Sequence, residues 1–149
     1  MTAATAALLE PALAEARAGL AEGGVPVGAA LFIDDRLVAS GRNQRVQQGD
    51  PILHGETHCL QVAGRRPAAD YRRATLVTTL SPCDMCTGAI LLFGIPRVII
   101  GENRTFLGGE ELLRSRGVEL VIVDDVECAA LMAEFIRSAP EVWNEDIAV

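Results

Sequence analysis

The sequence predicts an α/β fold, a mixed β-sheet with helices on both of its faces. Two strand-like segments near the N-terminus flank Asp34-Asp35, a dipeptide typical of a tight hairpin turn. After them, strand-like and helix-like segments alternate to the end of the chain, as in units whose parallel strands are joined by right-handed crossovers. Of the 149 residues, 50% are hydrophobic, which is enough for one buried core. We therefore expect a single domain over residues 1–149.

The N-terminal part is predicted to be one helix followed by the hairpin. Apolar residues at helical spacing predict a helix over 8–22, with Pro11 in its first turn and Gly23-Gly24 after its end. The hairpin strands are expected over 25–33 and 37–41.

Two later helices are predicted to begin in the same way. A polar, loop-like segment ends in Asp50-Pro51, which suggests an N-cap followed by a first-turn proline and a helix that runs to about Ala63. After a strand over 74–79, Ser81-Pro82 repeats the pattern and predicts a helix that ends at Phe93. The remaining expected elements are strands at 97–100 and 118–123 and helices at 110–116, 125–138 and 141–147.

Charge and composition limit the classes of function. The formal net charge is −7, which argues against a polyanionic partner such as nucleic acid. Arg65, Arg66, Arg72 and Arg73 could form a local basic patch or only a solvated turn. No apolar run reaches the ~18 residues of a membrane helix, and the N-terminus lacks the basic start of a secretory signal. We expect no membrane contact and a cytoplasmic location.

Two short motifs carry the candidate chemistry: His54-Gly55-Glu56 and Ser81-Pro82-Cys83-Asp84-Met85-Cys86. Together they offer one imidazole, two thiols and a carboxylate that is not needed as a ligand. Three protein ligands with an open fourth position are typical of a catalytic zinc, which lowers the pKa of a bound water. The spacing matches the general signature of zinc deaminases. Both motifs fall at predicted helix N-termini, where the helix dipole favours a thiolate.

Other interpretations of these residues remain open at this point. A Cys-x-x-Cys pair also occurs in structural zinc sites and in redox proteins. His58 lies one turn after His54 as in zinc proteases, but Gly55 stands where that motif has glutamate. We interpret His58 as a histidine that supports the metal ligands or as an ordinary packed histidine, and Cys59 and Cys128 as buried thiols on apolar helix faces.

The chain resembles the cytidine deaminase superfamily, and within it the fungal-type, free-base cytosine deaminases. The resemblance extends from Gly23 to Trp143 and on into the tail. Its most specific segments are Leu53–Glu56, Thr78–Ile90, Gly101-Glu102-Asn103 and Trp143-x-Glu145-Asp146-Ile147.

The resemblance implies a three-layer α/β/α sandwich with a mixed five-stranded sheet, a homodimer, and hydrolysis of the nucleobase cytosine to uracil and ammonia. It implies one Zn²⁺ per chain on His54, Cys83 and Cys86. In the implied reaction the metal activates a water for attack on C4 of the base, and Glu56 shuttles the protons.

The resemblance also implies the residues that bind the base. Asn43 and the Gly55 backbone N–H would hold the polar edge of the pyrimidine. Asp146 would lie near the leaving amine. The residues implied to line the pocket are Val27, Phe106 and Trp143. Asn144 departs from the family pattern, which has a second aromatic residue there, and this raises the question of substrate range.

Rival functions differ in substrate or in class. The runner-up is a deaminase of another free base or heterocycle, such as guanine or adenine. A tRNA-editing adenosine deaminase shares the zinc motifs but would need a basic approach surface. A zinc-stabilised binding module without turnover is the rival from a different class.

Overall fold

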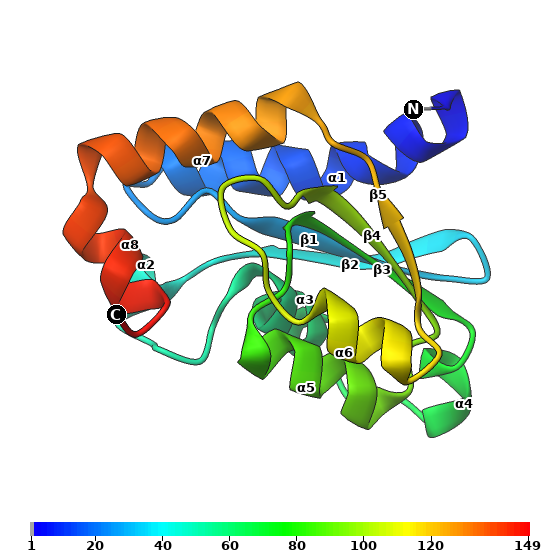
Figure 1. Cartoon of the computed structure of the whole chain (residues 1–149). Coiled ribbons are helices and arrows are strands. Elements are labelled where there is room, and N and C mark those ends of the chain that lie inside the picture. Colours follow the sequence, from blue (N-terminus) through cyan, green and yellow to red (C-terminus); the bar gives the residue numbers. More distant parts are fainter. Residues whose placement is uncertain (1) are drawn as a thin grey trace.

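A five-stranded β-sheet with the strand order β2-β1-β3-β4-β5 forms the centre of the computed structural model, which describes residues 2–149 (Figure 1). Its strands are β1 (Gly28–Ile33), β2 (Arg36–Arg42), β3 (Ala74–Leu80), β4 (Arg97–Glu102) and β5 (Glu119–Ile122). The β1 strand is antiparallel to both β2 and β3, whereas β3, β4 and β5 are parallel. The predicted mixed sheet is confirmed.

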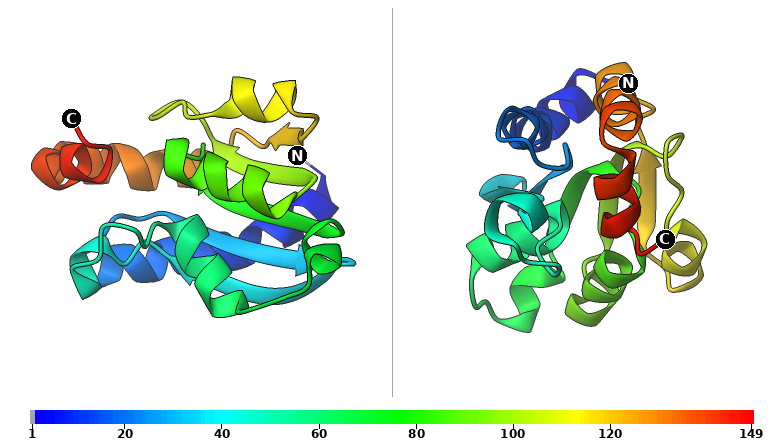
Figure 2. Two further views of the ribbon diagram at one scale, coloured as in Figure 1. Left: turned by 90° about the horizontal axis from the view of Figure 1, so that it is seen from below. Right: turned by 90° about the vertical axis from the view of Figure 1, so that its left-hand side faces the viewer.

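Helices cover both faces of this sheet (Figures 1 and 2). One layer consists of α1 (Ala3–Ala21) and α7 (Val126–Ser138). The other consists of α3 (Gly55–Ala63), α5 (Asp84–Phe93) and α6 (Glu110–Ser115). The C-terminal α8 (Pro140–Asp146) lies beyond the sheet, at the end where β3 and β4 finish. Among residues 2–149, no helix is both long and apolar enough to cross a bilayer.

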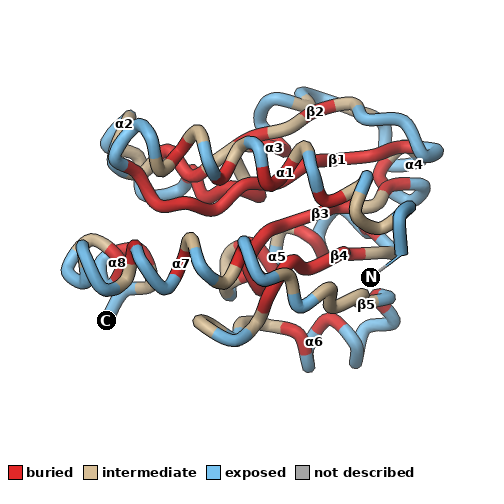
Figure 3. Tube along the Cα trace, turned by 90° about the horizontal axis from the view of Figure 1, so that it is seen from above, coloured by how far each residue is buried: buried red, intermediate tan, exposed pale blue. Residues whose placement is uncertain are grey.

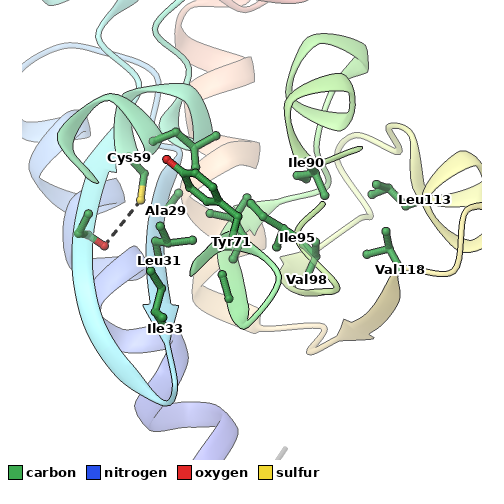
Figure 4. Packing of buried hydrophobic residues seen from close by; sticks show 14 of the residues in the cluster. Ala29, Leu31, Ile33, Cys59, Tyr71, Ile90, Ile95, Val98, Leu113 and Val118 are labelled. Atoms are coloured by element: carbon green, nitrogen blue, oxygen red, sulfur yellow. Dashed lines mark hydrogen bonds between the residues drawn. The ribbon is translucent and has the colours of Figure 1, made fainter. Parts of the chain in front are cut away.

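The apolar core contains three clusters, of which two lie on opposite faces of the sheet and the third includes Val27, Leu80 and Trp143 near the C-terminal helix. Leu31, Leu76 and Val98 belong to the cluster on the side of α3, α5 and α6, together with Ile90 and Leu113. Figure 4 shows part of this cluster. Adjacent residues along the same strands, including Ala30, Val77 and Ile99, face α1 and α7. The central strands are buried on both faces (Figure 3), which explains their almost continuous apolar sequences.

The hairpin turn forms where the sequence predicts it. Asp34 and Asp35 both have positive φ, 50° and 63°, as a two-residue turn with the twist of its flanking strands requires. The first strand begins at Gly28 and not at residue 25, because the Val27 N–H donates to the Val25 carbonyl at 2.8 Å, which makes a tight turn before the strand.

The prediction that Pro11 lies in the first turn of the N-terminal helix is wrong. The α1 helix begins at Ala3, where the Thr2 side chain accepts a hydrogen bond from the Thr5 N–H, and Pro11 lies in its interior. Proline there removes one intrahelical bond. The helix continues because its buried face, which includes Leu9 and Leu13, packs on the sheet.

Both predicted cap-and-proline starts are also displaced. The N-caps are His54 for α3 and Cys83 for α5. Asp50 instead accepts a hydrogen bond from the Ile52 N–H at 2.9 Å, which makes a local turn before the helix. Two one-turn helices, α2 (Arg45–Gln48) and α4 (Ala68–Tyr71), were not predicted, because they are too short to show periodicity.

Candidate active site

Two helix N-termini meet at the end of the sheet where β3 finishes. His54 and Cys83 are the N-cap residues of α3 and α5, and both have extended backbone conformations. The first N–H groups of each helix have no intrahelical partner, so both termini favour negative charge. The prediction that both motifs lie at helix starts is therefore confirmed, with boundaries shifted by a few residues.

His54, Cys83 and Cys86 form a cluster with the dimensions of a metal site. Their ligand atoms all lie within 4.8 Å of one another. The Cys83 and Cys86 sulfurs lie 3.4 Å and 3.8 Å from His54 Nδ1. In a tetrahedral zinc site with the usual bond lengths, ligand atoms are about 3.5–3.8 Å apart. The three side chains therefore fit a zinc ion, and one tetrahedral position remains for a non-protein ligand.

The two thiols behave as a coupled pair. The hydrogen bond from Cys86 lowers the pKa of Cys83 to about 4, against the opposing effect of burial, and the bond to His54 acts in the same direction. The pKa of Cys86 is raised well above its usual value by its hydrogen bond to Cys83 and by burial. A divalent cation would displace the remaining proton and turn both groups into thiolate ligands.

Glu56 lies beside this cluster as a buried carboxylate, 4% exposed. Burial raises the pKa of Glu56 to about 7, and the negative charge of Cys83 adds to this effect. A carboxyl group with a pKa near neutrality can both accept and return a proton, as general acid–base catalysis requires.

A small cavity of about 20 Å³ opens next to the cluster. This is room for little more than one water molecule. The lining residues come from six separate parts of the chain: Val27, Asn43, His54, Glu56, Leu80, Ser81, Cys83, Phe106, Trp143, Asp146 and Ile147. Nearly all of the predicted site residues are thus brought together. Gly55 and Cys86 do not line the cavity, but Gly55 is the first residue of α3 and Cys86 belongs to the metal cluster.

Asn43 is fixed by hydrogen bonds at both ends of its amide group. Its oxygen accepts a bond from the Arg45 N–H at 2.9 Å, and its nitrogen donates to Asp146 at 3.0 Å. These bonds define the orientation of the amide and leave one N–H of Asn43 for an acceptor on a ligand.

Asp146 lies on the buried side of the C-terminal helix α8, whereas its position in the tail alone would suggest a solvent-exposed acid. It is 9% exposed, and its Oδ1 lies 3.5 Å from His54 Nε2, the ring nitrogen on the side away from the cysteines. A carboxylate in this position orients a metal-bound histidine.

Phe106 and Trp143 form the aromatic wall of the cavity. Their ring centroids are 5.8 Å apart with an interplanar angle of 87°, the edge-to-face arrangement that aromatic pairs prefer. Both rings line the cavity, which is consistent with the predicted stacking role.

The other singled-out residues lie outside the site. His58 Nδ1 accepts a hydrogen bond from the Arg42 N–H at 3.0 Å, which agrees with the interpretation as a packed histidine. Cys59 and Cys128 are 0% and 1% exposed, so the prediction of buried thiols is confirmed. Asn144 lies on the exposed side of α8 and does not line the cavity.

Leu80, Ser81 and Ile147 line the cavity but were not predicted as site residues. Leu80 and Ser81 stand directly before the Pro-Cys motif, and Ile147 follows Asp146. The sequence signal that could have identified them is their place in segments that carry the family resemblance, Thr78–Ile90 for the first two and 143–147 for Ile147.

A histidine and two cysteines in metal-binding geometry beside a buried acid, on an α/β/α scaffold, define a metal-dependent hydrolytic enzyme. The chain belongs to the cytidine and deoxycytidylate deaminase family, whose zinc-binding region matches residues 3–102. The family expected from the sequence is thus confirmed, and with it the class of zinc-dependent deaminases.

Individual relatives differ in their substrates. The chain is 51% identical over 140 residues to a cytosine deaminase of Candida albicans, with 93% of each chain covered. It is 28% identical to a tRNA-specific adenosine deaminase of Streptococcus pyogenes, covering 89% of this chain and 90% of that one. The structure of a guanine deaminase from Nitrosomonas europaea superposes with a TM-score of 0.71 at 25% identity, covering 87% of this chain and 82% of that one.

Proposed function

We propose that this protein is a cytosine deaminase, which hydrolyses cytosine to uracil and ammonia. The observation that carries the proposal is the set of side chains that line the cavity beside the metal cluster: the polar Asn43, Glu56 and Asp146 and the rings of Phe106 and Trp143. The 51% identity to the Candida albicans enzyme supports the same substrate.

In the proposed mechanism, His54, Cys83 and Cys86 hold one zinc ion, which when bound supplies an activated water to C4 of the base. Glu56 takes one proton of that water and passes it to N3 of the ring, then takes the remaining proton from the new C4 hydroxyl and delivers it to the amine, which leaves as ammonia. General acid–base help of this kind contributes about 10²–10⁴-fold in rate.

Binding of the base is assigned to residues around the rest of the cavity. Asn43 and the Gly55 N–H orient the polar edge of the pyrimidine, and Asp146 lies on the side of the amine. Val27, Phe106 and Trp143 exclude water from the ring faces.

The small volume of the inner cavity supports a free base as the substrate. Phe106, Asp146 and Ile147 line both the inner cavity and a larger outer depression of about 530 Å³, and so do His54 and Cys83 of the metal cluster. A ring does not fit into the inner cavity of about 20 Å³ unless α8 or the Phe106 segment moves. A ribose or a tRNA strand attached to the ring would have to pass the same barrier.

The surface charge gives no support for a nucleic-acid substrate. Two of the four arginines that could have formed a basic patch are paired with acids: Arg66 lies 3.6 Å from Asp70, and Arg73 lies 3.0 Å from Asp34. The formal net charge of −7 acts in the same direction.

We also propose that the whole chain acts as one catalytic unit and forms a homodimer through the outer side of α3, α4 and α5. An apolar groove of about 850 Å³ runs between these helices. Leu92, Ile52 and Phe93 line it and are 79%, 62% and 36% exposed. Exposed apolar surface of this kind marks a protein interface. A cytoplasmic location is consistent with four free cysteines.

A substrate panel with metal analysis tests the proposed function. Purified protein is assayed for ammonia release from cytosine, cytidine, guanine, adenine and a tRNA, with zinc measured in the same preparation. Turnover of cytosine but not cytidine, with one zinc per chain, is the expected result. Turnover of a purine base would identify the runner-up, and zinc without any turnover would indicate a binding module.

A further inference from the structure

The segment 103–109, which joins β4 to α6, is anchored at both ends by buried glutamates. Glu102 precedes it and is 0% exposed, and Glu110 follows it and is 3% exposed. Neither side chain lines the cavity. The Gly101-Glu102-Asn103 motif is one of the specific segments of the family resemblance, but none of its residues has a role in the proposed mechanism.

The Glu102 carboxylate organises the turn that follows it. One oxygen accepts hydrogen bonds from the backbone N–H groups of Arg104 and Thr105, at 2.7 Å and 3.0 Å. The other oxygen accepts a bond from the Thr105 hydroxyl. A buried carboxylate is costly unless it is hydrogen-bonded, so these donors hold the side chain and the turn together.

Glu102 is also tied to the strand that leads into the metal cluster. Its backbone carbonyl accepts a bond from the Ser81 N–H at 3.0 Å, and it pairs with Leu80 in the parallel ladder. Leu80 and Ser81 both line the cavity, so the turn at Arg104 and Thr105 is built directly on the cavity wall.

The far end of the segment is equally constrained. The Gly108 N–H donates to Ser81 Oγ at 2.9 Å, and Ser81 Oγ donates to Glu110 at 2.7 Å. Gly108 approaches the Pro82 carbonyl so closely that a Cβ there would lie 1.9 Å from the oxygen. Only Phe106 and Leu107 lie between the two anchored ends. Phe106 directly follows the turn that Glu102 holds, and its edge-to-face contact with Trp143 closes the cavity.

We propose that Glu102 is a positioning residue that holds Phe106 against Trp143 and thereby sets how tightly the site binds a flat ring. The identity of the ring rests on the function proposed above, whereas the positioning of Phe106 does not. Loss of the Glu102 contacts loosens the aromatic wall and leaves the metal cluster and Glu56 in place. Its effect therefore falls on KM more than on kcat.

The test uses Glu102→Gln and Thr105→Val, with Glu111→Gln as a control that removes one exposed negative charge from α6. Trp143 is the only tryptophan of the chain, so its fluorescence reports the aromatic contact in the free protein. We expect Glu102→Gln to shift the emission to longer wavelength and to raise KM about tenfold, with kcat changed much less. Thr105→Val should produce smaller changes in the same direction, and the control should match the wild type.

A Phe106→Ala background separates positioning from a general loss of stability. If Glu102 acts through Phe106, Glu102→Gln adds little to KM once the ring is gone. An equal increase in both backgrounds, or unchanged emission and KM in Glu102→Gln, would overturn the proposal. If Glu102→Gln fails to fold, Thr105→Val decides alone, and wild-type emission in that variant refutes the proposal. The emission needs no substrate, so a protein inactive on cytosine would reject the proposed function and leave this readout intact.

Discussion

Asp146 accepts a hydrogen bond from Asn43 at 3.0 Å, although 103 residues separate the two in the sequence. The same carboxylate oxygen lies 3.5 Å from the ring of His54. One residue of the C-terminal helix thus contacts the residue assigned to the pyrimidine edge and a residue of the metal cluster. The α8 helix is therefore part of the cavity wall.

Asp146→Ala is expected to weaken binding of the base. The Asn43 amide loses its acceptor, and α8 loses its polar contact with the rest of the site. An unsatisfied buried group costs about 1–3 kcal/mol, which corresponds to roughly a 5–150-fold rise in KM. Glu145→Ala is the matched control, because Glu145 is 65% exposed in its ion pair with Arg45. Equal KM values for the two variants would contradict the role assigned to Asp146.

Glu56→Gln is expected to keep the zinc and lose most of the turnover. Glutamine preserves the size of the side chain but cannot take and return a proton. The loss of kcat should be about 10²–10⁴-fold. Ammonia release gives the rate, and metal analysis of the same sample gives the zinc content. A variant with near-normal kcat would exclude Glu56 as the proton shuttle.

Cys83→Ala is expected to lose the metal itself. Only two of the three protein ligands would remain, and two ligands hold zinc much more weakly. Cys128→Ala is the control, because this cysteine is equally a free thiol but is buried between the sheet and α7, away from the cluster. Zinc content and the thermal midpoint should fall together in Cys83→Ala and in chelator-treated wild type, whereas Cys128→Ala should retain one zinc per chain.

The metal cluster could be predicted from the sequence because its signals are local. His54 and Glu56 are two residues apart, and Cys83 and Cys86 are three apart. Each pair follows a polar residue and a proline, a local pattern that predicts the start of a helix. The alternation of strands and helices likewise defined the sheet and its parallel half. In both cases the information lies within a few residues of the feature that it predicts.

The misses have a different physical origin. The packing of α1 on the sheet keeps that helix continuous through Pro11, so tertiary contacts override a local signal. Asp146 would have been interpreted as a solvated acid without the family resemblance, because its burial depends on partners far away in the sequence. The contacts of Glu102 and Glu110 could not be predicted for the same reason. Their partners come close only when the fold brings β3, β4 and the segment 103–109 side by side.

The proposed dimer gives a last prediction. Leu92 is 79% exposed and lines the apolar groove of α3, α4 and α5, so Leu92→Glu should place a charge in the interface and yield a monomer. Val126→Glu is the control, because Val126 is 82% exposed on α7, in the layer on the opposite face of the sheet. Light scattering coupled to gel filtration measures the mass of both variants.

Because α3 and α5 carry the metal cluster on their inner ends, loss of the dimer should also lower the thermal midpoint and the zinc retention of Leu92→Glu. Wild-type protein that is already monomeric at micromolar concentration would refute the dimer. A Leu92→Glu variant that stays dimeric would place the interface elsewhere on the molecule.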